Sequence, residues 1–107
     1  MTQITPQSLQ QWLADESRKP PVLLDVREPW EYQTCHIDGS VLAPMNTIPA
    51  RAQELDRDTD TVVICHHGAR SYQVCVFLER NGFSNLYNLQ GGVNAWADQV
   101  ETTMPRY

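Results

Sequence analysis

Short unbroken runs of apolar residues recur along the chain and predict strands that are covered on both faces. The clearest are VLLDV at 22–26 and TVVIC at 61–65, while VLAPM at 41–45 and SNLYNL at 84–89 are shorter examples. Because such runs have no polar face, we expect a parallel sheet packed between helices, as in α/β proteins.

The stretches before and between these runs have apolar residues at helical spacing. The first predicted helix, from Pro6 to Asp15, has Leu9, Trp12 and Leu13 on one face, and Thr5 can cap it. Further helices are predicted in REPWEY at 27–32, in IPARAQEL at 48–55, between Ser71 and Gly82, where Val74, Phe77 and Leu78 can face the sheet, and in QGGVNAWADQV at 90–100. The alternation predicts a central sheet of four to five parallel strands with helices on both faces and right-handed crossovers.

The chain of 107 residues contains no Ser/Gly-rich or charge-rich linker, so we expect one domain over residues 1–107. A domain of this size hides about two thirds of the surface of its unfolded chain, which is enough to fold without disulfides or a structural metal. The three cysteines form no CxxC pair, and the start of the chain shows no signal-peptide pattern. We therefore expect a reducing compartment, the cytoplasm.

The charge pattern excludes two classes of partner. The formal net charge is −5 and the basic residues are scattered, whereas nucleic-acid and anionic-membrane surfaces need clustered Lys and Arg. No apolar run approaches the length of a membrane span. Any anion site must therefore be local, built from helix-end amides and a single arginine.

The segment CHHGAR at 65–70 is the main candidate for chemistry. It follows a predicted strand and precedes a predicted helix, which is where α/β sheets bind ligands. Helix-end amides, Arg70 and the neighbouring histidines favour the thiolate form of Cys65, and Gly68 lets the backbone curl its N–H groups inward. A surface turn around a buried cysteine is the alternative, but Gly68, Arg70 and Ser71 at these offsets favour a reactive site.

Three stretches together resemble the rhodanese-like domains, and the resemblance covers nearly the whole chain. LLDVREPWEYQTCHIDGS at 23–40 is similar to the N-terminal signature of the family, VICHHGARS at 63–71 to its C-x-x-G-x-R active-site loop, and NLQGGVNAW at 88–96 to its C-terminal signature. The likeness is greatest to single-domain thiosulfate sulfurtransferases.

The resemblance implies a sulfurtransferase in which Cys65 takes sulfur from a small anionic donor such as thiosulfate and holds it as a persulfide. Cyanide, a small thiol or a protein thiol would then accept the sulfur, and we expect no cofactor. Loop amides would stabilise the persulfide, Arg70 would attract the donor, and Ser71 would add a hydroxyl donor or cap the helix. The residues expected to form the loop and bind the donor are His66, His67, Gly68, Ala69, Arg70 and Ser71.

Asp25 and Arg27 match the D-x-R of the family at the end of the first predicted strand. We expect them to support the loop through hydrogen bonds, with a surface ion pair worth about 0–1 kcal/mol as the alternative. Gly91 and Gly92 are assigned to turn geometry, and Trp96 to the core.

Three other functions compete with this interpretation. A phosphatase of the same fold would have five residues between its cysteine and arginine, whereas only the four residues 66–69 intervene here. A zinc site on Cys65, His66 and His67 is disfavoured, because consecutive residues rarely converge on one ion, and no metal is expected. A sulfur carrier or interaction module acting on a partner protein remains open.

Cys35 stands where similar domains commonly have glycine before His36. Simple packing of a small thiol is the plain explanation. The alternative is that Cys35 reaches Cys65, attacks its persulfide and forms a disulfide, which requires Cα atoms within about 7 Å.

Overall fold

The predicted apolar runs form four strands of a five-stranded, fully parallel sheet, in a computed structural model that describes all 107 residues. The strand order is β1-β5-β4-β2-β3. The strands are β1 (Thr2–Ile4), β2 (Val22–Asp25), β3 (Val41–Leu42), β4 (Thr61–Ile64) and β5 (Leu86–Leu89). The predicted α/β class and parallel sheet are confirmed.

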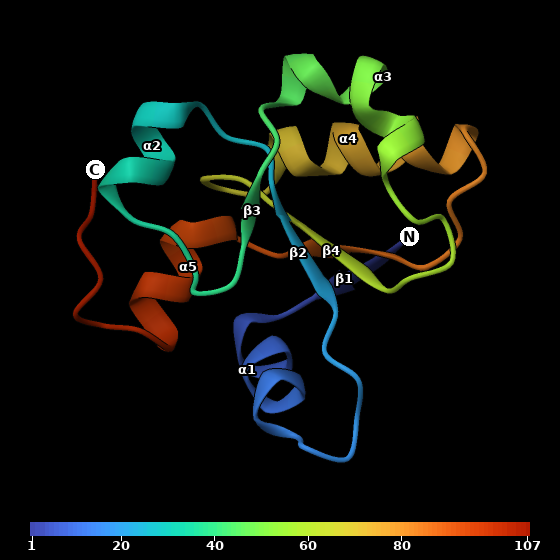
Figure 1. Cartoon of the computed structure of the whole chain (residues 1–107). Helices are drawn as coiled ribbons and strands as arrows, with labels where there is room; N and C mark the ends of the chain where they lie inside the picture. The colour runs from blue at the N-terminus through green and yellow to red at the C-terminus, as the bar shows by residue number, and fades with distance from the viewer.

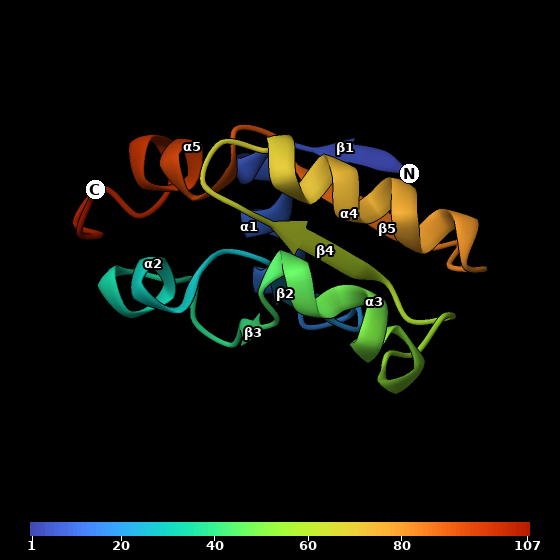
Figure 2. The same ribbon diagram turned by 90° about the horizontal axis from the view of Figure 1, so that it is seen from above.

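Helices cover both faces of the sheet, as predicted. In Figure 1, α1 (Pro6–Ala14) and α5 (Gly92–Gln99) lie on one side, and α3 (Ile48–Arg51) and α4 (Ala69–Arg80) on the other. Figures 1 and 2 both place α2 (Pro29–Thr34), α5 and the C-terminus together at one end of the molecule. The loops that follow β2, β4 and β5 therefore meet at this end.

The strand periodicity divides the core into two clusters. Alternate side chains of one strand point to opposite faces, so neighbours such as Val62 and Val63 belong to different clusters. The cluster under α1 and α5 includes Leu9, Trp12, Leu23, Val62, Ile64, Leu89, Val93 and Trp96, and the cluster under α4 includes Leu24, Val63, Cys65, Val74, Cys75, Leu78 and Leu86.

Two predicted helix ends are confirmed. Thr5 caps α1, because its hydroxyl oxygen accepts the N–H of Ser8 at 3.1 Å. Gly82 follows the end of α4 with φ +91°, a conformation that favours glycine. No helix of the structure is both long enough and apolar enough to cross a membrane.

Two local predictions were wrong and one strand was missed. The missed strand is β1, because only Ile4 of its three residues is buried and its pairing with β5 is a tertiary contact. Leu13 is partly exposed rather than part of the buried stripe. The stretch 48–55 is not one helix, because α3 ends at Arg51 and two 3₁₀ turns, Met45–Thr47 and Ala52–Glu54, flank it.

The N-terminus of α5 packs directly on the segment that follows β4. The N–H of Val93 donates to the carbonyl of Cys65 at 2.9 Å, and the N–H of Asn94 donates to the carbonyl of His66 at 3.0 Å. Gly92 has φ +61°, and a Cβ atom there would lie 2.3 Å from the carbonyl oxygen of Cys65. Only glycine allows α5 to approach this closely.

We predict that Gly92→Ala lowers the free energy of unfolding by more than about 3 kcal/mol, because backbone strain adds to a clash with backbone oxygens. Gly39→Ala is the matched control. Gly39 also has positive φ, +84°, but a Cβ there meets nothing within 4 Å. The free energy of unfolding of Gly39→Ala, measured with urea, should fall by only about 1 kcal/mol. Equal losses in the two variants would refute the steric argument.

Candidate active site

Cys65 lies immediately after β4, and only 1% of the residue is exposed. Its sulfur accepts the N–H of Gly68, with a nitrogen–sulfur distance of 3.0 Å, and lies 3.3 Å from the hydroxyl oxygen of Ser71. Gly68 is the N-cap residue of α4 and has φ +105°, so the loop can turn back over the sulfur. The sulfur thus lies at the N-terminus of a twelve-residue helix, where the backbone amides favour negative charge.

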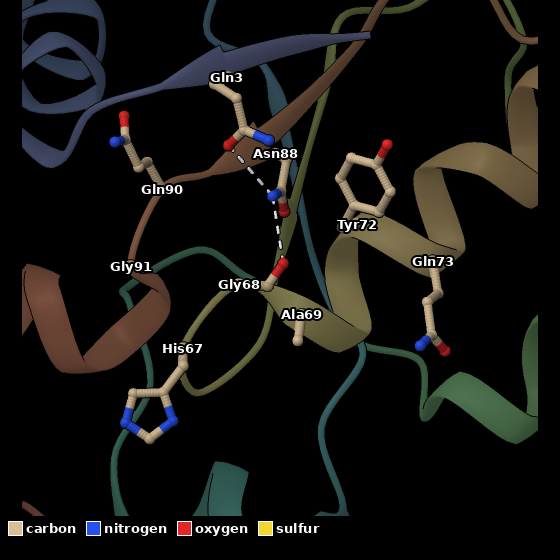
Figure 3. A pocket seen from close by; sticks show the side chains of 9 residues that line it. All are labelled: Gln3, His67, Gly68, Ala69, Tyr72, Gln73, Asn88, Gln90 and Gly91. Carbon is tan, nitrogen blue, oxygen red and sulfur yellow. Dashed lines mark hydrogen bonds between the residues drawn. The ribbon is translucent and has the colours of Figure 1, made fainter.

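Asn88 on β5 organises the loop from the other side. Its Nδ2 donates to the side-chain oxygen of Gln3 and to the carbonyl of Gly68, both at 3.2 Å (Figure 3). Its Oδ1 accepts the hydroxyl proton of Ser71, which leaves the Ser71 oxygen free to accept from the Cys65 thiol. Ser71 therefore positions the sulfur, and the alternative that it caps α4 is wrong because Gly68 is the N-cap residue.

Arg70 forms a bidentate ion pair with Glu31 of α2. Its Nη1 and Nη2 donate to Glu31 Oε1 and Oε2 at 2.7 and 2.9 Å. These hydrogen bonds lower the pKa of Glu31 to about 2 and raise the pKa of Arg70. The one guanidinium of the loop is therefore already bound to a carboxylate.

Asp25 and Arg27 form a fully buried ion pair, so the surface alternative is wrong. Arg27 Nη2 lies 2.7 Å from Asp25 Oδ2 and donates to the carbonyl of Cys35, also at 2.7 Å. Arg27 Nη1 donates to the hydroxyl of Tyr107 at 2.8 Å. The hydrogen bonds of this guanidinium thus hold α2 and the C-terminal segment, and the support of the loop is indirect, through Glu31.

His66 packs its ring edge-on against Tyr107, with ring centres 4.2 Å apart, and against His67. Burial lowers the pKa of His66, so its imidazole is neutral at neutral pH. It therefore does not supply the positive charge that was expected to favour the thiolate of Cys65. No group of three or more His, Cys, Asp or Glu side chains is arranged to hold a metal ion.

An open hollow of about 540 Å³ lies beside the loop (Figure 3). It contains no charged side chain, and neither Arg70 nor Glu31 lines it. Its polar groups are amides, a phenol and an imidazole. The lining residues are Gln3, His67, Gly68, Ala69, Tyr72, Gln73, Asn88, Gln90 and Gly91.

The other two cysteines are buried and free. Cys35 ends α2 with φ −164° and ψ 151°, extended backbone that any residue adopts, and it packs in the cluster under α1 and α5. Packing in this cluster accounts for Cys35. Cys65 packs in the cluster on the opposite face of the sheet. The disulfide between Cys35 and Cys65 stays a prediction. Burial raises the pKa of Cys75 to about 12, which keeps that thiol protonated.

Three residues that complete the site were not predicted from the sequence, namely Glu31, Asn88 and Tyr107. Glu31 follows Glu28 at capping-box spacing, but that spacing indicates only a local role at the start of α2. Asn88 was detectable as a polar residue inside an otherwise apolar strand. Nothing in the sequence near Tyr107 indicates its contact with Glu31.

Comparisons with known proteins agree with this geometry. The rhodanese-like domain family matches residues 5–99. A protein of Allochromatium vinosum named sulfurtransferase is 40% identical and covers 91% of this chain and 89% of its own length. The thiosulfate sulfurtransferase GlpE of Pseudomonas fluorescens is 37% identical over 78% of this chain and 73% of its own.

A solved structure extends the likeness to three dimensions. The rhodanese-like domain protein of Staphylococcus aureus superimposes with a TM-score of 0.84 at 33% identity, over 94% of this chain and 95% of that one. The family match spans β2, β4, the Cys65 loop and α5. Two of these relatives are named sulfurtransferases, and the chain belongs to the family of rhodanese-like domains.

Proposed function

We propose that this protein is a sulfurtransferase that moves sulfane sulfur from thiosulfate or a related donor to a thiophilic acceptor through a persulfide on Cys65. The observation that carries the proposal is the sulfur of Cys65 held at the start of α4, 3.0 Å from the N–H of Gly68. The relatives named sulfurtransferases support the same chemistry.

The first step is attack of the Cys65 thiolate on the outer sulfur of the donor. A sulfur–sulfur bond to Cys65 forms, the bond inside thiosulfate breaks, and its electron pair leaves with sulfite. The charge is conserved, since one thiolate and one thiosulfate dianion give one persulfide anion and one sulfite dianion. The Gly68 N–H and the helix-end amides stabilise the persulfide anion.

In the second step the acceptor takes the outer sulfur. An acceptor thiolate attacks that sulfur, becomes a persulfide itself and releases Cys65 as thiolate, so neither step needs a cofactor. The uncharged hollow beside the loop offers room for the acceptor, and its amides suit a small thiol or a protein thiol with exposed backbone groups.

We also propose that the protein works in the cytoplasm. The chemistry requires Cys65 as a reduced thiol, and all three cysteines are free. A reducing compartment maintains that state.

We predict that Cys65→Ser reduces sulfur transfer from thiosulfate to cyanide by about a thousandfold or more, because a hydroxyl does not form a persulfide. Cys75→Ala is the matched control, since it also removes a buried thiol. It should lose only about 1 kcal/mol of stability and keep its turnover. Substantial activity in Cys65→Ser would overturn the proposed function.

Arg70 gives a second prediction. Arg70→Ala should lower kcat/KM for thiosulfate by about tenfold or more, because the donor loses a cation while the Glu31 carboxylate stays behind. Arg70→Lys should recover only part of the loss, since an ammonium does not make the bidentate contact.

The control for net charge is Arg80→Ala, which removes an exposed arginine from the far end of the same helix. Its kcat/KM should match that of the unmodified protein. Equal values for Arg70→Ala and Arg80→Ala would show that Arg70 takes no part in donor binding.

A further inference from the structure

The arginine that a donor anion would use is bound to a carboxylate. Both Nη atoms of Arg70 donate to Glu31, at 2.7 and 2.9 Å, in the side-by-side geometry that makes such pairs strong. A donor that is to bind the guanidinium must therefore displace Glu31 or share Arg70 with it.

Glu31 is held more firmly than Arg70. The Glu31 side chain is 6% exposed, whereas that of Arg70 is 36% exposed. Glu31 Oε1 also accepts the backbone N–H of Glu28 at 2.9 Å, and Oε2 accepts the hydroxyl of Tyr107 at 2.8 Å. If Arg70 turns toward a donor, the Glu31 carboxylate stays in place and its negative charge stays beside the donor site.

Solvent screens the charge of His67, the exposed basic side chain of the loop. The other basic groups close to the loop do not offset the charge of Glu31. Arg27 is fully buried and paired with Asp25. Burial lowers the pKa of His66, which is neutral at neutral pH. The amides at the start of α4 contribute only about half a positive charge, and the whole chain carries −5.

Building on the function proposed above, we infer that Glu31 sets donor specificity. By occupying Arg70 and keeping a negative charge at the mouth of the site, it favours sulfane sulfur donors of low charge, such as monoanionic thiosulfonates and persulfides. It disfavours the thiosulfate dianion. Glu31 acts through Arg70 and through its charge, and it touches no reacting atom.

Two donors with the same reacting sulfur but different net charge allow the effect of charge to be measured alone. Methanethiosulfonate is thiosulfate with a methyl group in place of one anionic oxygen, so it carries one negative charge instead of two. In both, the Cys65 thiolate attacks the terminal sulfur, and the leaving group departs with the bonding electrons as methanesulfinate or sulfite. The number of anions is the same before and after each reaction.

The test compares Glu31→Gln with the unmodified protein. Glutamine keeps the capping-box bond to the Glu28 N–H and one acceptor for Arg70, but it removes the charge. We expect kcat/KM for thiosulfate to rise by about tenfold relative to kcat/KM for methanethiosulfonate. The intrinsic reactivities of the two donors cancel, because each donor is compared with itself across the two proteins.

Tyr107→Phe is the control that removes a contact of Glu31 but keeps the negative charge of Glu31. It removes the hydrogen bonds that the Tyr107 hydroxyl makes with Glu31 and Arg27 but leaves the carboxylate, so the donor ratio should stay within about twofold of the unmodified value. A shift as large as that of Glu31→Gln would show that the ratio follows the packing of the C-terminal segment rather than the charge.

A second measurement needs no variant. Sulfate and methanesulfonate, at equal ionic strength, are inert anions that differ by one charge. In the unmodified protein, sulfate should protect Cys65 from alkylation no better than methanesulfonate does, and protection by sulfate at about tenfold lower concentration would overturn the inference.

The possible results separate the role of Glu31 from the proposed sulfurtransferase function. A donor ratio unchanged in Glu31→Gln, with a Cys65 persulfide still formed, overturns the role of Glu31 alone. Absence of the persulfide with either donor overturns the proposed function and this inference with it. The expected rise in thiosulfate use supports both.

Discussion

The active loop depends on two hydrogen bonds that the first amides of α5 donate to the carbonyls of Cys65 and His66. With these carbonyls turned toward α5, the backbone is free to direct the N–H of Gly68 at the sulfur. Gly92 makes the approach possible because a Cβ atom there would overlap both carbonyl oxygens. The helix that fixes the loop thus contributes no group to the sulfur itself.

A second constraint begins at the buried pair of Asp25 and Arg27. A guanidinium without exposure is costly unless every donor finds a partner, and Arg27 finds its partners in Asp25, in the backbone of α2 and in Tyr107. These bonds set the position of α2, and α2 presents Glu31 to Arg70. The buried pair of Asp25 and Arg27 therefore determines where the negative charge of Glu31 lies at the mouth of the site, although it does not contact the substrate.

The sequence allowed the fold and the centre of the site to be predicted, because both rest on local patterns. Unbroken apolar runs identify buried strands, and a cysteine at a strand end before Gly68 and Arg70 identifies the loop. The partners of these residues were not predictable. Glu31 and Tyr107 lie 39 and 37 positions from Arg70 along the chain, and only the packing of α2 and the C-terminal segment brings them close to it. The strand β1 escaped prediction for the same reason, since its pairing with β5 joins opposite ends of the chain.

In the proposed reaction, Cys65 and no other thiol of the protein carries the sulfur. The most direct measurement is mass spectrometry of the protein after brief incubation with a sulfane sulfur donor, followed by digestion under conditions that preserve persulfides. We expect an intact mass increased by one sulfur atom, with that sulfur on the peptide that contains Cys65. Sulfur found on the peptides of Cys35 or Cys75, or no added sulfur with any donor, would contradict it.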